Sequence, residues 1–170
     1  MTGDRNDPAL AYNFEVELVD AQSVGAFLSL TTGVPSKAGF SEVSGLEVSI
    51  EPEKYKEGGN NGTELVFPGA ASWSTLKLRR GVVKSSDLWD WHIGFIEGRG
   101  VRRDGVVTLL DQNRDAVRSW RFLNGLPVKW LGPNFNAMEA AVAIEEIEIA
   151  HEGITGTGSP NLVSAIGALF

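Results

Sequence analysis

The stretch RRDGVVTLLDQNRDAVRSWRFLNGLPVKWLGPNFNA, residues Arg102–Ala137, decides the fold. Val101–Asp111 is predicted to be a strand, and Ala116–Phe122 alternates apolar and polar side chains as a second strand does. The residues between them, Gln112–Asp115, favour a hairpin turn. A short apolar piece, Pro127–Leu131, follows. The stretch therefore predicts paired antiparallel strands in a β-rich chain.

Three stretches that precede this hairpin also predict strands. Tyr12–Val19 alternates apolar and polar residues as a half-buried strand does. Gly39–Glu51 alternates as well, and Trp73–Val83 places Leu76 and Leu78 on one face.

Ser85–Glu97 carries the clearest helix pattern. Its apolar side chains recur three and four residues apart, as on one face of an amphipathic helix. Ser85 or Ser86 is the expected N-cap, and Gly98 and Gly100 are expected to end the helix.

The C-terminal part begins with a long predicted strand, Ala140–His151. Its apolar side chains switch faces after Ile144, and either a bulge at Glu145–Glu146 or coverage of both faces accounts for the switch. Gly153–Ser159 is expected to be a linker, and Asn161–Phe170 a short apolar tail.

These patterns predict a mainly β chain: a two-sheet β-barrel or sandwich with one flanking α-helix, a long protruding loop and a short apolar C-terminal segment. We divide the chain into a flexible N-terminal arm (residues 1–11), a β-barrel domain (residues 12–154) and a C-terminal extension (residues 155–170). A chain of 170 residues buries enough surface for one stable core.

The polar stretch PEKYKEGGNNGT, Pro52–Thr63, is expected to protrude as a hairpin or loop. Asn61–Gly62 is a strong tight-turn signal, and we prefer the turn to the glycosylation sequon that the same residues begin. The stretch offers no side chains to a core, and the apolar tail LVSAIGALF would leave an exposed apolar patch. The two features together predict association with other chains.

The composition excludes several function classes. A net charge of -7 argues against nucleic acid as a partner, because phosphate binding needs clustered Lys and Arg. The absence of cysteine excludes a disulfide scaffold, a thiolate zinc site and a cysteine nucleophile. The sequence shows neither a secretory signal nor an apolar run near the ~20 residues that span a bilayer, so we expect a soluble chain made in the cytoplasm.

The search for catalytic motifs fails: there is no phosphate-binding glycine loop, no HExxH and no nucleophile elbow. His92 and His151 are interpreted as structural, and Glu146 and Glu148 as a solvated or interface face. We therefore expect no catalytic residue, no metal site and no cofactor. Two alternatives stay open. One is an enzyme that uses those carboxylates or His151, and the other is a small-ligand-binding β-barrel, which the five Trp and eight Phe suggest.

Five stretches in order resemble the tail-tube family of contractile phages and phage-like extracellular injection particles. They are AGFSEVSGLEVSIEPEKYKEGGNNG (Ala38–Gly62), LKLRRGVV (Leu76–Val83), LWDW (Leu88–Trp91), the Arg102–Ala137 stretch and VAIEEIEIAHEGI (Val142–Ile154). Each is weak alone, but their order and spacing make the resemblance specific, and it covers nearly all of the predicted domain. The EVSGLE and AHEG-like segments resemble the phage-like branch more than the hemolysin-coregulated protein of secretion systems.

The resemblance implies a structural, non-enzymatic subunit of the inner tube of a contractile injection system. Homo-hexameric rings would stack into a hollow tube, which a contractile sheath drives through a target envelope, with baseplate and spike proteins at its end and protein cargo in its lumen. It implies no specific nucleic acid, and a membrane only indirectly, through the puncturing assembly. Assembly would be cytoplasmic, and the particle would then be released or anchored in the cell; a phage tail tube is the alternative.

By the same resemblance, the protruding loop would contact the neighbouring ring and the sheath. Its expected contact residues are Glu53, Lys54, Tyr55, Lys56, Glu57, Gly58, Gly59, Asn60 and Asn61. The chain departs from the family pattern at two places. Val19–Ala38 is longer than the expected turn, so we expect an added hairpin there, and the apolar tail after Gly153 is longer than the simplest pattern.

Overall fold

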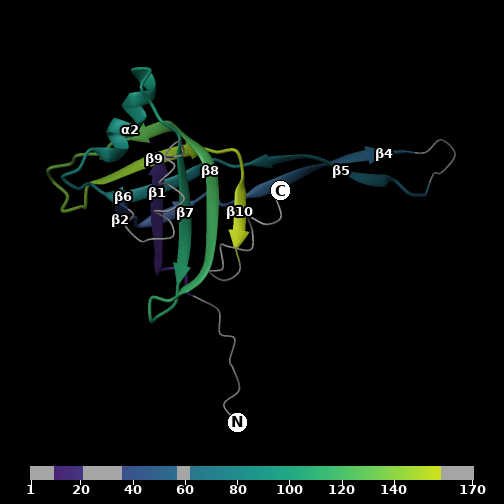
Figure 1. The fold of residues 1–170 in the computed structure, drawn as a ribbon, viewed down its shortest axis with the longest axis horizontal. Coiled ribbons are helices and arrows are strands. Elements are labelled where there is room, and N and C mark those ends of the chain that lie inside the picture. The colour runs from purple at the N-terminus through teal and green to yellow at the C-terminus, as the bar shows by residue number, and fades with distance from the viewer. Residues whose placement is uncertain (1–9, 21–35, 57–61, 158–170) are drawn as a thin grey trace, which may run out of the picture.

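A computed structural model describes residues 10–20, 36–56 and 62–157. Within these residues the chain is mainly β with a single helix (Figure 1). The strands are β1 (Phe14–Asp20), β2 (Ser36–Ala38), β3 (Glu42–Ser44), β4 (Val48–Tyr55), β5 (Leu65–Trp73), β6 (Leu76–Gly81), β7 (Arg103–Leu110), β8 (Ala116–Leu131), β9 (Ile144–Ala150) and β10 (Ile154–Thr157), and the helix is α2 (Asp87–Ile96).

The strands form two layers that share β8. Neighbouring strands follow the order β2-β1-β7-β8-β9-β6-β3, all antiparallel, and β10 adds to β8. The first part of β8 pairs with β7, and its last part, from Leu126, pairs with β9. The two predicted pieces Ala116–Phe122 and Pro127–Leu131 are therefore one continuous strand. The outer strands β2 and β3 do not pair with each other, so the sheet is an open sandwich and not a closed barrel.

The bend of β8 lies at Asn124 and Gly125. Asn124 has a positive φ of 53°, and its backbone N–H donates to the carboxylate of Asp104 at 2.9 Å. A Cβ at Gly125 would lie 2.7 Å from the carbonyl oxygen of Arg103 and 2.8 Å from the ring of Phe122. Asparagine and glycine are the residues that tolerate this backbone best. The strand can therefore leave one layer and enter the other without a loop.

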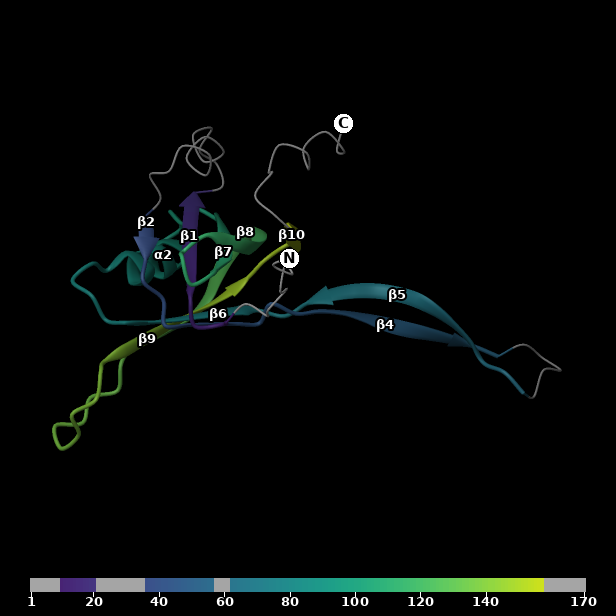
Figure 2. The same cartoon turned by 90° about the horizontal axis from the view of Figure 1, so that it is seen from below.

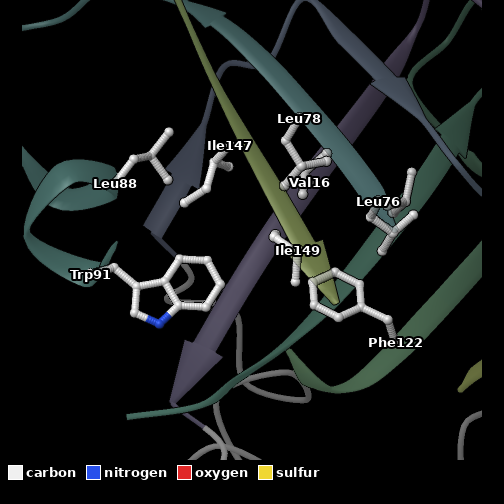
Figure 3. Packing of buried hydrophobic residues seen from close by; sticks show 9 residues of the cluster. Val16, Leu76, Leu78, Leu88, Trp91, Phe122, Ile147 and Ile149 are labelled. Carbon is white, nitrogen blue, oxygen red and sulfur yellow. The ribbon is translucent and has the colours of Figure 1, made fainter. Parts of the chain in front are cut away.

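The core lies between the two layers and under α2 (Figure 3). β6 and β9 each bury alternate side chains, as the period of a strand requires. Val16 on β1, whose alternation was predicted, is 1% exposed. The buried cluster consists of Val16, Leu76, Leu78, Leu88, Trp91, Val107, Phe122, Ile147 and Ile149.

The helix was predicted within two residues of each end, and its N-cap is one of the two serines expected there. Ser86 is the N-cap residue, yet its side chain makes no capping bond and instead donates to Asp90 at 2.6 Å. Packing fixes the helix: Trp91 Nε1 donates to the carbonyl of Val101 at 2.8 Å, and Leu88 is fully buried.

Of the two forms expected for Pro52–Thr63, a hairpin or a loop, the structure shows the hairpin. β4 continues to Tyr55, and β5 begins at Leu65. Residues 52–55 therefore belong to a strand, although proline and charged residues are uncommon in strands and did not predict one. Pro52 lies opposite Pro68 in a ribbon of two strands, where each strand has an open edge that tolerates proline. The predicted strands Gly39–Glu51 and Trp73–Val83 are likewise interrupted, at residues 45–47 and 74–75.

The apolar side chains of the predicted strand Ala140–His151 switch faces after Ile144, but neither expected cause, a bulge or coverage of both faces, is present. β9 begins at Ile144 and pairs with β6 without a shift from Ile144 to Ile149, so there is no bulge at Glu145–Glu146. Val142 precedes the strand and is 77% exposed, so the second face is not covered either. Glu145 occupies a buried position in the same phase as the buried isoleucines.

The predicted linker Gly153–Ser159 is also wrong in part, because Ile154–Thr157 form β10 and pair with β8. Most of the Val19–Ala38 segment, where an added hairpin was expected, lies outside the described residues, as do the tip of the protruding loop and the apolar tail. None of the helices in the described part of the chain has the length and apolar character needed to cross a membrane.

Gly105 gives the first testable prediction. A Cβ at this position would collide with the ring of Phe122, which is 1% exposed and has no room to move. We expect Gly105→Ala to lower the free energy of unfolding by about 1–3 kcal/mol, the usual cost of overpacking a core. Urea denaturation of purified protein measures the change.

Gly39→Ala is the matched control, because nothing lies within 4 Å of a Cβ there. Its stability should stay close to that of the unchanged chain. A Gly105→Ala variant as stable as Gly39→Ala would contradict the close packing of β7 on Phe122.

Candidate assembly interface

β4 and β5 form a hairpin that projects from the sandwich along the longest axis of the molecule (Figures 1 and 2). They pair only with each other among the described strands. Every residue of β4 is exposed, and so is every residue of β5 except Gly69. The hairpin nevertheless carries large apolar side chains: Val48, Ile50, Tyr55, Leu65, Val66, Phe67 and Trp73 are 38–60% exposed.

The pairing register shows how these side chains divide between the two faces. Residues directly opposite each other share a face, and Val48 lies opposite Trp73, Ile50 opposite Ala71 and Lys54 opposite Val66. A bulge between Ile50 and Pro52 places one extra residue on β5. Alternation along β4 is not disturbed, so Val48, Ile50, Pro52 and Lys54 share one face. The apolar ribbon face therefore comprises Val48, Ile50, Pro52, Val66, Pro68, Ala71 and Trp73, with Lys54, Lys56 and Glu64 at its outer end.

Such a hairpin is not stable by itself. Two strands without a third strand or a packed helix are marginal in water, and this ribbon has neither along most of its length. An exposed apolar surface of this kind marks a site of association with another chain. The hairpin is therefore the main candidate interface of the described residues.

The described part of the contact segment expected from the sequence lies on this hairpin. Glu53, Lys54 and Tyr55 are the last residues of β4, and Lys56 follows; all four are exposed. The remaining expected residues, 57–61, lie outside the described part of the chain. Sequence reasoning missed the return strand, although the apolar run Leu65–Phe67 was a signal for it.

The carboxylates weighed as an acid/base pair belong to a ladder of ion pairs across the outer face of β3, β6, β9 and β8. Glu146 lies 3.0 Å from Arg79, which also reaches Glu42 at 3.0 Å. Glu148 lies 3.2 Å from Lys129 and 3.7 Å from Lys77. Each carboxylate thus has a basic neighbour on an adjacent strand, and the ladder joins four strands side by side.

A buried ion network joins α2 to the sandwich. Arg80 is 3% exposed, and its guanidinium lies 2.7 Å from Glu145 and 2.7 Å from Asp87 in the first turn of the helix. Burial opposes the charge, but the hydrogen bonds to Asp87 and Glu145 outweigh it and raise the pKa of Arg80. Burial likewise opposes ionisation of Asp87, and the hydrogen bonds from Arg80 and Ser85 lower the pKa of that carboxyl.

The two histidines make structural contacts, as expected. The Nδ1 atom of His92 lies 3.1 Å from the carbonyl oxygen of Pro127, which ties α2 to β8. The Nε2 atom of His151 lies 3.1 Å from the carbonyl oxygen of Ser74, and its ring lies between Trp73 and Phe122. Burial lowers the pKa of His151. The described residues contain no group of three His, Asp or Glu side chains that would hold a metal ion.

Residues 10–155 match the family model of the T4-like virus tail tube protein gp19, and the chain belongs to this family. The family is one of structural tube proteins, and the chain is an inner-tube subunit of the contractile injection type. A search of curated proteins finds no match.

Solved structures share the fold. One is a chain of the baseplate of the anti-feeding prophage, with a TM-score of 0.77, 24% identity, and 89% of this chain and 97% of that chain covered. Another is a chain of the PVC sheath-tube complex, an extracellular contractile injection system in its extended state, with a TM-score of 0.74, 24% identity, and 91% and 95% covered. An Hcp protein matches with a TM-score of 0.52 at 11% identity over 85% and 91%.

The ion network gives a second prediction. Arg80→Met should lower the free energy of unfolding by about 3–5 kcal/mol, because Glu145 keeps its buried charge and loses its partner. Arg79→Met, one residue along the same strand, should cost only about 0–1 kcal/mol because that side chain is 44% exposed. Urea denaturation measures both, and equal losses would show that burial does not distinguish the two arginines.

The lowered pKa of His151 gives a third prediction. The folded chain binds a proton at this ring less readily than the unfolded chain, so its contribution to stability is complete above pH 6.5 and is lost as the pH falls below that value. Between about pH 7.5 and about pH 5.5, the unfolding midpoint should fall less in His151→Gln than in the unchanged chain. If thermal scans show that the unfolding midpoints of the two proteins fall equally between these pH values, His151 is not a source of the acid sensitivity.

Proposed function

We propose that six copies of the chain close into a ring, and that these rings stack into the hollow inner tube of a contractile injection system. Contraction of a surrounding sheath would drive the tube through a target envelope and deliver protein cargo. Family membership and the projecting hairpin support the proposal. The single observation that carries it is the exposed apolar ribbon face, which an isolated chain would leave in water.

The open sheet edges support ring closure. Among the described strands, β2, β3 and β10 each pair on one side only, and unpaired edges invite pairing with another chain. A head-to-tail contact between copies either closes into a ring or continues without end. A tube of stacked rings uses both outcomes, which suits a subunit with unpaired edges and a long projection.

The hairpin, including the contact residues Glu53–Asn61, would reach the neighbouring ring and the sheath. The structures that share the fold come from a sheath-tube complex, a baseplate and a tube-terminating cap, and these are the partners we propose for this chain. The subunit would act mechanically, without catalysis or cofactor. We propose cytoplasmic assembly, followed by release of the particle, because the matched PVC chain belongs to an extracellular system; a phage tail tube is the alternative.

A fourth prediction tests the assembly. Val66→Glu places a charge on the apolar ribbon face and should abolish tubes in negative-stain electron microscopy, because burying that valine is worth about 1.5–3 kcal/mol at every contact. The melting temperature should stay unchanged, since Val66 is 60% exposed and outside the core.

Ser72→Glu is the matched control, because Ser72 lies on the opposite face of the same hairpin and is exposed. It should still form six-fold rings and tubes. Normal tubes from Val66→Glu would exclude the apolar ribbon face as an assembly surface. An unchanged chain that stays monomeric at high concentration and on a purified baseplate would overturn the proposed function.

A further inference from the structure

The end of the molecule opposite the hairpin carries a groove. The segment 132–143, which connects β8 to β9, extends away from the sandwich on the side remote from β4 and β5 (Figure 2). It bounds a groove of about 410 Å³ together with the beginning of β9 and the side chain of Arg79. The apolar side of the groove consists of Leu131, Phe135, Ala141, Val142, Ala143 and Ile144.

The exposed apolar side chains of this groove are not part of the sandwich core. Phe135 is 87% exposed and Val142 is 77% exposed, and neither belongs to the buried cluster. The segment has local order of its own, because Asn136 accepts hydrogen bonds from the backbone N–H groups of Met138 and Glu139. An ordered segment that presents aromatic and aliphatic side chains to water is the form of a docking surface.

The charges of the groove and of the outer end of the apolar ribbon face are unbalanced in opposite directions. At the groove, Arg79 is shared by two carboxylates, and the exposed Glu139 has no ion-pair partner among the described residues. At the outer end of the apolar ribbon face, two lysines share one carboxylate: Lys54 lies 3.5 Å and Lys56 4.0 Å from Glu64. The groove therefore has a spare negative charge, and the ribbon a spare positive charge.

We propose that the apolar ribbon face of one copy docks in this groove of a second copy, with Lys56 directed at Glu139. The proposal rests on the proposed function and names the acceptor surface for the hairpin. The hairpin extends away from the segment 132–143 of its own chain (Figure 2), and this segment lines the groove, so the contact joins different copies. Because donor and acceptor lie at opposite ends, each copy can give one contact and receive one, as a repeating assembly requires.

A charge exchange tests the contact. Lys56→Glu and Glu139→Lys should each raise the concentration needed for assembly about tenfold, because each places like charges opposite one another. The double variant restores opposite charges and should recover most of the loss. Lys84→Glu, with Lys84 exposed outside both surfaces, is the control for the change of net charge, and it should assemble normally. Failure of the double variant to recover any assembly would overturn the pairing of these two residues.

A crosslink tests the same contact by distance. The chain has no cysteine, so a Val66→Cys, Val142→Cys double variant carries the only two thiols. After assembly, a short bis-maleimide should join copies into a ladder on a denaturing gel. A Val66→Cys, Val117→Cys variant is the control, because Val117 is also exposed but lies on the first part of β8, away from the groove.

The outcomes separate this proposal from the proposed function. Tubes that form normally but give neither the ladder nor the charge recovery would overturn the groove as acceptor and leave the tube function standing. If Val66→Cys is instead captured by a co-expressed sheath protein, the sheath occupies the ribbon and the proposal is wrong. An unchanged chain that forms neither rings nor tubes under any of these conditions would overturn both.

Discussion

The structure depends on one strand that serves two layers. β8 supplies hydrogen-bonding edges to β7 and then to β9, so the two layers of the sandwich are covalently continuous through its bend. The bend is possible because Asn124 accepts a positive φ and Gly125 has no Cβ to meet the Phe122 ring. The core then closes between the layers, and α2 docks over it through the ion pair of the buried Arg80 with the partly exposed Asp87.

The hairpin, unlike the sandwich, has no core of its own. β4 and β5 have backbone pairing but almost no burial, so their side chains contribute little to the stability of the single chain. Exposed apolar surface is a cost in a monomer and a source of affinity in an assembly. The molecule thus separates a self-sufficient sandwich from a projection that gains its burial from another chain. That division suits a subunit of a tail tube, which must fold first and assemble afterwards.

Charge plays two different roles in this acidic chain. On the outer face of β3, β6, β9 and β8, carboxylates and basic side chains alternate across the strands and neutralise one another. Cross-strand pairs of this kind help to fix the register of a sheet. At the two ends of the molecule the balance is incomplete: Glu139 lies at the groove, and two lysines share the single carboxylate of Glu64 at the outer end of the apolar ribbon face. Exposed unbalanced charges are better suited to choosing a partner than to holding the fold together.

The sequence by itself determined the mainly β class, the span of the helix and the inward faces of β1 and β6, because these features follow from local hydrophobic period. It also located half of the hairpin through its polar, turn-rich composition. Only the tertiary structure decided that β8 is one strand, that Glu145 is buried and that Leu65–Trp73 returns along β4. Each depends on a partner far away in the chain: the bend needs Asp104, the buried carboxylate needs Arg80, and an exposed strand is specified by pairing and not by a buried face.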